Sequence, residues 1–419
     1  AEAMQNWGEF VSLSFDGGGE TYSTVLCIVK NGNRKILTRH KWPNSLGHFY
    51  STFTGFLGFK MLEGEYKMMG LAPYGKAKYK QLILDKILIL KSNGKYELNT
   101  KICDYHAALN GKFSSKMIKL FGPPRDKNGK LSKLHTDLST SVQVAFEEAL
   151  MHILKPALNK NINKLVISGG CALNVTANGK LIEKNLFDEI IIPPAPHDAG
   201  CAIGAALCSM KKRKIKFNSR NIRNPYLGRN FTNKEISFTL SKNLRNPPGP
   251  ETEQDLILKT ANFLSKGKLI AWFQGRSEFG PRALGARSFL ADPRDDNIRE
   301  IINQKIKKRE LFRPFAPSTI KEFSKKFFNL NQSSPYMNIV ATVINENVPA
   351  VTHIDGTARI HTVDKESHFR YYSLIKTFGD LTGVHCLLNT SFNIQEPIIY
   401  TPLEAINTFK NSDVDLLVI

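Results

Sequence analysis

Residues 165–170 read Leu-Val-Ile-Ser-Gly-Gly, and this short stretch is the clearest indicator of the fold. Its apolar residues are typical of a fully buried strand, and the glycine pair marks a tight turn directly after it. Before this strand, residues 139–154 repeat apolar side chains at the spacing of a helix. After it, a short apolar run at 189–192 predicts another strand. Small and apolar residues at 199–210 predict a helix that packs tightly against its neighbours. Strands, glycine turns and helices therefore alternate, which predicts an α/β domain.

A second α/β unit is expected towards the carboxyl end. Lys, Arg and Asn replace apolar residues at about 211–225, which is typical of a linker. Beyond it, a helix at 251–265 ends before Gly267 and precedes a strand at 269–273. The predicted division is a first domain at 1–215, a linker at 216–225 and a second domain at 226–419.

The composition is that of a globular protein with a large positive charge. The 419 residues include 58 Lys and Arg against 37 Asp and Glu, giving a formal net charge of +21. This charge fits either nucleic-acid binding or a lysine-rich surface, and the dispersed lysines favour the surface. Nucleic acid is therefore not the expected partner, but an RNA-binding or transfer-RNA-modifying protein stays the alternative.

Cysteine usage and hydropathy bear on location. The six cysteines include no CxxC pair, which fits reduced thiols in a cytoplasmic protein. No apolar run approaches the roughly 18 residues that a membrane-spanning helix needs, so no membrane partner is expected.

Three glycine turns follow predicted strands of the first domain. Asp16 opens the run Asp-Gly-Gly-Gly-Glu, Gly170 closes the turn after the 165–168 strand with Asn174 just beyond, and Asp198 precedes Ala199-Gly200. Glycine lets backbone N–H groups approach a phosphate, and an aspartate can hold a metal ion. Singly, each fits a hairpin turn or a helix N-cap as well; together they suggest a nucleotide held between strand ends.

Arginines gather in the second domain between Arg276 and Arg294, and again in residues 309–317, which read Arg-Glu-Leu-Phe-Arg-Pro-Phe-Ala-Pro. Glycine, proline and aromatic residues separate these charges, so the guanidinium groups are expected to be fixed in place. A fixed guanidinium donates two parallel hydrogen bonds to phosphate or carboxylate. Anion binding is therefore predicted, with structural ion pairs as the alternative.

These motifs resemble those of a known family, the nodulation-protein and cephem-type O-carbamoyltransferases, which include aminoglycoside carbamoyltransferases. The matching stretches run in order along nearly the whole chain; they are residues 45–47, 64–75, 168–174, 275–294, 312–317, 355–359 and 389–397. The resemblance implies an α/β fold in two parts. It implies an incomplete actin-like domain of the sugar kinase and heat-shock ATPase type, similar to the threonylcarbamoyl-synthesis protein, followed by an α/β twisted-sheet domain that forms carbamoyl-adenylate.

The resemblance also implies an activity. Family members use carbamoyl phosphate and ATP to make carbamoyl-adenylate and carbamoylate a hydroxyl of a small molecule or saccharide. It implies a divalent metal of the Fe²⁺ type in the first domain and Mg²⁺ with ATP; a homodimer is left open. The family's histidine-bearing opening segment is not found before Asp16, so the chain is expected to be an N-terminally truncated form that fails to complete transfer alone.

Carried over residue by residue, the resemblance assigns roles to nine positions. Those implied to bind carbamoyl phosphate and act in catalysis are Arg282, Arg313, Arg359 and Asn389. Those implied to contact the nucleotide are Gly170, Asn174 and Lys67. Those implied to hold the metal are Asp16 and Asp198.

Overall fold

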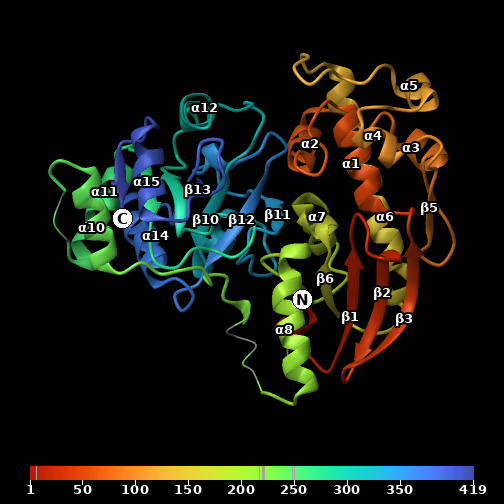
Figure 1. The fold of residues 1–419 in the computed structure, drawn as a ribbon, viewed down its shortest axis with the longest axis horizontal. Coiled ribbons are helices and arrows are strands. Elements are labelled where there is room, and N and C mark those ends of the chain that lie inside the picture. Colours follow the sequence, from red (N-terminus) through yellow and green to blue (C-terminus); the bar gives the residue numbers. More distant parts are fainter. Residues whose placement is uncertain (6, 217, 219–221, 248, 250) are drawn as a thin grey trace. The chain divides into compact units, whose positions relative to one another are not determined.

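The computed structural model describes residues 1–419 except 6, 217, 219–221, 248 and 250. The chain divides into two compact units, Ala1–Arg220 and Asn221–Ile419, called unit 1 and unit 2 below. Both are mixed α/β structures with their own sheets (Figure 1). Residues 217 and 219–221 of the expected linker lie outside the described residues.

Unit 1 is built on a five-stranded sheet in the order β3-β2-β1-β6-β7. Its strands are β1 (Glu9–Phe15), β2 (Tyr22–Lys30), β3 (Asn33–Lys41), β6 (Lys164–Ser168) and β7 (Glu189–Ile191). The first three are antiparallel, whereas β1, β6 and β7 run parallel, with Leu13 paired to Ile167. A separate hairpin pairs β4 (Leu88–Leu90) with β5 (Tyr96–Leu98).

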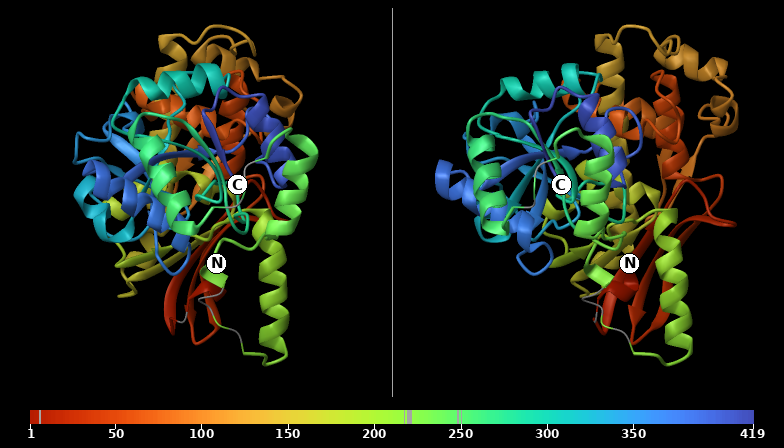
Figure 2. Two further views of the ribbon diagram at one scale, coloured as in Figure 1. Left: turned by 90° about the vertical axis from the view of Figure 1, so that its left-hand side faces the viewer. Right: turned by 60° about the vertical axis from the view of Figure 1, so that its left-hand side comes forward.

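The helices of unit 1 are α1 (Leu46–Phe56), α2 (Glu65–Leu71), α3 (Lys80–Lys86), α4 (Tyr105–Leu109), α5 (Ser115–Phe121), α6 (Lys133–Leu158), α7 (Val175–Glu183) and α8 (Cys201–Lys212). Helix α6 packs against β2 and β3. It is longer than predicted because Ser132 and His135 form a capping box that starts it earlier. The twist of the red strands β1 to β3 can be followed in Figure 2.

Helix α8 differs from expectation, since none of its residues is buried. Its small apolar residues were expected to bring a close neighbour, but within the described structure every side chain of this helix keeps some solvent exposure. The prediction of tight packing was therefore wrong for this helix.

Unit 2 is built on a seven-stranded mixed sheet in the order β11-β12-β10-β13-β9-β8-β14. The strands are β8 (Ile270–Phe273), β9 (Arg287–Ala291), β10 (Ala316–Ile320), β11 (Ile339–Thr342), β12 (Thr357–Val363), β13 (Cys386–Ser391) and β14 (Leu416–Val418). The helices are α10 (Asn233–Asn243), α11 (Glu253–Ser265), α12 (Asn297–Ile301), α13 (Ser324–Phe327), α14 (Phe369–Thr382) and α15 (Pro402–Lys410). Helices α11 and α14 cover a core that includes Trp272, Leu374 and Phe378, all fully buried.

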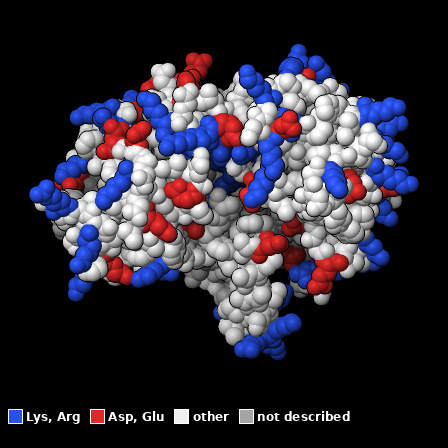
Figure 3. Space-filling model, turned by 45° about the horizontal axis from the view of Figure 1, so that its top comes forward, with Lys and Arg blue, Asp and Glu red and all other residues white. Residues whose placement is uncertain are grey.

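The surface carries charges of both signs. On the face drawn in Figure 3, Lys and Arg side chains spread over the whole surface, with Asp and Glu among them. No helix of the described structure is both long and apolar enough to cross a membrane.

Candidate functional site

Four arginines from three segments of unit 2 lie within electrostatic reach of one another. Arg282 lies in the loop between β8 and β9, Arg309 and Arg313 lie just before β10, and Arg359 lies on β12. The positive charges of Arg282, Arg309 and Arg313 all lower the pKa of Arg359. We call these four residues the arginine cluster; Arg309 is the member that the sequence analysis did not single out.

Two members of the cluster are partly buried without a counter-charge. Burial lowers the pKa of Arg282 to about 10, and burial followed by the neighbouring arginines lowers the pKa of Arg359 well below its usual value. The Nε atoms of both are shielded from solvent and have no hydrogen-bond partner, and neither side chain forms an ion pair within the described residues. Arg313 forms an ion pair with Glu310 at 3.8 Å. Such a site favours an anionic ligand.

The loop that carries Arg282 is fixed by Glu278. Its Oε1 accepts hydrogen bonds from the backbone N–H groups of Leu284 and Ala286, both at 2.7 Å, and of Arg287 at 3.2 Å. Gly285 has a φ of +94°, and a Cβ there would overlap the ring of Tyr371. The glycine is therefore required by both backbone conformation and space.

The other arginines between 276 and 294 make structural contacts. Arg287 is fully buried, lies 3.6 Å over the ring of Phe273 and donates to backbone carbonyls. Arg294 holds the carboxylate of Asp292 with hydrogen bonds from Nε and Nη2. Arg276 is exposed. Sequence alone did not separate these roles, because ion-pair partners are fixed only by the fold.

Lys307 is a buried cation that the sequence analysis missed. A π-helical turn at Ile302–Ile306 precedes it, and its side chain is 2% exposed. Its ammonium donates to the carbonyl and hydroxyl oxygens of Ser391 and, at 2.8 Å each, to the carbonyl oxygen and Oδ1 of Asn393. Lys307 thereby anchors the segment after β13. Lys307 stands in a run of basic residues, which is typical of an exposed surface. Only the fold shows that its side chain is buried.

Asn389 links the arginine-bearing segments. It is 1% exposed, and its Nδ2 donates to the carbonyl of Ala283 at 3.2 Å and to Oγ of Ser318 at 3.0 Å. Ser318 in turn lies 2.8 Å from Nδ1 of His361. Asn389 therefore ties the loop of Arg282 to strand β10, and its catalytic role stays a prediction.

In unit 1, the structure brings the three predicted glycine turns side by side. Asp16 follows β1, and its Oδ2 accepts the N–H of Gly170 at 2.8 Å, while the N–H of Gly169 donates to the carbonyl of Pro196 at 2.7 Å. A Cβ on Gly169, whose φ is +96°, would overlap the backbone of Phe15. The carboxyl ends of β1 and β6 and the loop after β7 thus meet at one edge of the sheet.

The predicted nucleotide residues have defined surroundings. Asn174 caps α7 by accepting the N–H of Ala177 at 3.0 Å and exchanges two hydrogen bonds with Gln143. Lys67 lies on α2. These contacts explain how Asn174 is positioned; the roles of Gly170, Asn174 and Lys67 in nucleotide binding stay predictions.

The predicted metal ligands do not form a metal site by themselves. Both carboxylate oxygens of Asp16 accept hydrogen bonds from backbone N–H groups, Oδ1 from Gly17 at 2.6 Å and Oδ2 from Gly170 at 2.8 Å. Asp198 is exposed and begins a single 3₁₀ turn. Within the described part of the chain, no group of three or more His, Cys, Asp or Glu side chains is arranged to hold a metal ion. We therefore assign no step to a metal.

Comparison with known proteins places the chain in a family. Residues 8–207 match the family model for the carbamoyltransferase N-terminus and residues 261–419 that for the carbamoyltransferase C-terminus. The chain is 40% identical to uncharacterized protein sll1178 of Synechocystis sp., over 98% of this chain and 72% of that protein.

Nodulation proteins are similar as well. The chain is 36% identical to nodulation protein NolO of Bradyrhizobium diazoefficiens, over 100% of this chain and 76% of the relative. It is also 36% identical to nodulation protein NolNO of Sinorhizobium fredii, of which it spans 61%. With both family models and these relatives in agreement, the chain belongs to the carbamoyltransferases, a family of enzymes that transfer carbamoyl groups.

Proposed function

We propose that the arginine cluster of unit 2 binds carbamoyl phosphate and that the chain uses it with ATP to form carbamoyl-adenylate. The carbamoyl group then passes to a hydroxyl of a small molecule or saccharide. The observation that carries the proposal is the pair of partly buried arginines, Arg282 and Arg359, whose Nε atoms are shielded from solvent and which lack a carboxylate partner among the described residues. Carbamoyl phosphate is a compact dianion that would supply the missing negative charge.

The proposed reaction balances in three steps. Water cleaves carbamoyl phosphate to carbamate and phosphate, and the arginines neutralise the charge that develops on the phosphate oxygens. A carbamate oxygen then attacks the α-phosphorus of ATP, forming carbamoyl-adenylate as pyrophosphate leaves. Finally the acceptor hydroxyl attacks the carbamoyl carbon, and AMP leaves with the bonding electron pair while the hydroxyl proton is released.

Unit 1 is proposed to bind the nucleotide at the sheet edge where Asp16 meets Gly170, with Asn174 and Lys67 as further contacts and Mg²⁺ accompanying ATP. Two features support this. The glycine turn at Gly169 and Gly170 lies directly against the end of β1, and its lack of side chains would let a phosphate approach the backbone there. The sheet, in which antiparallel β3-β2-β1 is continued by parallel β6 and β7, brings the ends of β1 and β6 together, as a nucleotide held between strand ends would require.

Binding of carbamoyl phosphate, measured by calorimetry, tests the site. Arg282→Ala and Arg359→Ala each remove charged hydrogen-bond donors worth about 1.5–3 kcal/mol, so the affinity should fall roughly 10- to 150-fold. Arg276→Ala, an exposed arginine of the same loop, is the matched control and should bind like the wild type. Wild-type affinity in both Arg282→Ala and Arg359→Ala would show that the anion binds elsewhere.

A further inference from the structure

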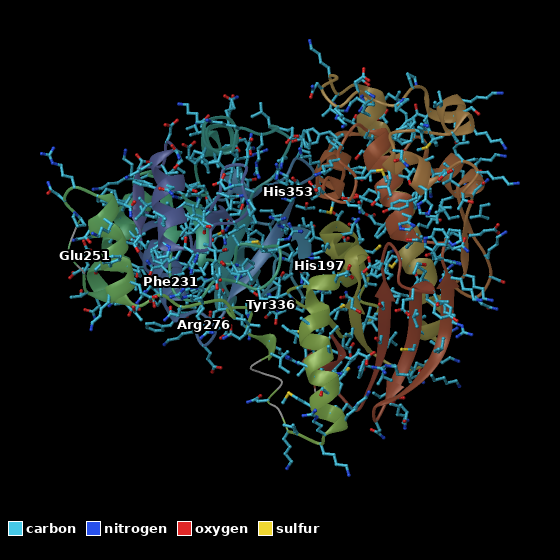
Figure 4. All side chains as sticks on the ribbon, in the orientation of Figure 1. His197, Phe231, Glu251, Arg276, Tyr336 and His353 are labelled. Atoms are coloured by element: carbon cyan, nitrogen blue, oxygen red, sulfur yellow. The ribbon has the colours of Figure 1, made fainter. Side chains whose placement is uncertain are left out.

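His353 lies in the turn that leads into β12, and Arg359 follows six residues later on that strand. Figure 4 labels it in unit 2, in the region of strands β11 and β12. Its backbone N–H donates to the carbonyl of Thr357 at 2.7 Å, and its own carbonyl accepts the N–H of Gly356 at 3.0 Å. The turn is therefore closed by its own backbone.

The hydrogen bonds around the ring determine which nitrogen carries the proton. The hydroxyl of Thr357 donates to Oδ1 of Asp355 at 2.7 Å, because an ionised carboxylate can only accept. The Oγ1 of Thr357 therefore offers a lone pair to Nδ1 of His353, 3.3 Å away. Nδ1 must then hold the proton as the donor, which leaves Nε2 of a neutral ring as a bare acceptor.

The ring is neutral near pH 7. Burial is the main cause that lowers the pKa of His353 to about 4, and the charges of Arg359 and Arg299 act in the same direction. The charge of Asp355 and the nearby carbonyl of Phe315 oppose the shift without cancelling it. A neutral imidazole has one donor and one acceptor, and the donor is already used.

The Nε2 atom has no hydrogen-bond partner and is shielded from solvent. The imidazole lies near the backbone carbonyl of Phe315, and the ring of Phe315 carries the guanidinium of Arg309 at 4.9 Å. His353 thus borders the arginine cluster from the β12 side, as its interaction with Arg359 also indicates. An unsatisfied shielded acceptor in such a place calls for a donor supplied by a ligand.

We propose that Nε2 of His353 accepts a hydrogen bond from the amino group of the carbamoyl moiety. Guanidinium groups only donate, so the cluster can hold the phosphate but cannot recognise an NH₂ group. A bare imidazole nitrogen provides that recognition, and it selects carbamoyl phosphate over acetyl phosphate, which has a methyl group in the same position. This inference rests on the proposed function of the arginine cluster and adds a specificity-determining residue to it.

Affinities for carbamoyl phosphate and acetyl phosphate, measured by calorimetry, test this. A site built to pair with an NH₂ group penalises the analogue that lacks it, so the wild type should prefer carbamoyl phosphate by at least tenfold. His353→Phe should abolish this preference, with little change in acetyl phosphate affinity. His353→Gln, whose amide oxygen can accept the same bond, should keep part of it. An undiminished preference in His353→Phe would overturn the inference.

Two further results keep this inference distinct from the proposed function. Wild-type protein that binds neither compound would defeat the assignment of the arginine cluster itself and this inference with it. Nitrogen-15 chemical shifts of the wild-type histidine ring need no ligand and no variant. They should show a protonated Nδ1 and a bare Nε2 for His353. A protonated Nε2 would overturn the inference even if the affinities for carbamoyl phosphate and acetyl phosphate changed as expected.

Discussion

Replacing Lys307 by methionine should destabilise unit 2 while leaving its packing volume nearly unchanged. The ammonium donates its three N–H groups to oxygen atoms of Ser391 and Asn393, and methionine keeps an unbranched side chain of similar length. All of these partners are neutral oxygens, and leaving such buried acceptors without a donor costs about 1–3 kcal/mol. We expect the free energy of unfolding of unit 2 to fall by that amount.

The assay must report on unit 2 alone, because two compact units need not unfold together. Trp272 is fully buried in unit 2, whereas Trp7 and Trp42 lie in unit 1. Urea unfolding followed by tryptophan fluorescence in a Trp7→Phe, Trp42→Phe background therefore isolates the signal. Lys305→Met, an exposed lysine of the same turn, is the control and should cost less than about 0.5 kcal/mol. A loss below about 1 kcal/mol in Lys307→Met would refute the reasoning.

Three other outcomes are expected. Asp137 is 2% exposed; burial would raise its pKa, but hydrogen bonds from Lys78, the N–H of Lys76 and Lys133 lower it to about 2. This pKa lies below the ordinary value of 3.8, so the stabilisation by the ionised Asp137 is complete above pH 3.8 and is lost as the pH falls towards 2. The Asp137→Asn variant should lack this loss of stability in acid. An acid-unfolding midpoint equal to that of the wild type would contradict the prediction. Gly285→Ala should destabilise unit 2 by several kcal/mol through overlap with Tyr371, as measured by the Trp272 signal. Gly267→Ala is the control, because φ there is +76° and no atom lies within 4 Å of the new Cβ, and it should cost only about 1 kcal/mol. Equal losses of stability in Gly285→Ala and Gly267→Ala would show that backbone strain, and not overlap with Tyr371, causes the effect. Carbamoyl phosphate at 100 times its dissociation constant should stabilise unit 2 by about 2.7 kcal/mol, and at the same concentration this gain should fall to about 0.3–1.4 kcal/mol in Arg359→Ala; an undiminished gain would place the ligand elsewhere.

The sequence was sufficient for features that depend on local pattern. The strand at 165–168, the glycine turn after it and the helix at 251–265 appear as β6, the Gly169–Gly170 turn and α11, because hydrophobic spacing and turn residues act over short distances. Helix α6 extends beyond its apolar stripe because the capping box at Ser132 lies outside that stripe.

Features that depend on distant partners could not be read in the same way. Arg282 and Arg294 are similar in sequence context, yet Arg294 meets Asp292 and Arg282 meets no carboxylate in the described structure. Lys307 stands in the run Lys305-Ile-Lys-Lys-Arg309, and only the fold brings Ser391 and Asn393 over its ammonium. The bare nitrogen of His353 depends on the orientation of the Thr357 hydroxyl, which no spacing predicts.

Isotope exchange between pyrophosphate and ATP tests the central claim most directly. With Mg²⁺ present and no acceptor, the label should enter ATP only when carbamoyl phosphate is supplied, because carbamoyl-adenylate formation is the step that releases pyrophosphate. Exchange should fall to background in Arg359→Ala and persist in Arg276→Ala. No exchange with carbamoyl phosphate, or undiminished exchange in Arg359→Ala, would contradict the assignment of carbamoyl-adenylate formation to the arginine cluster.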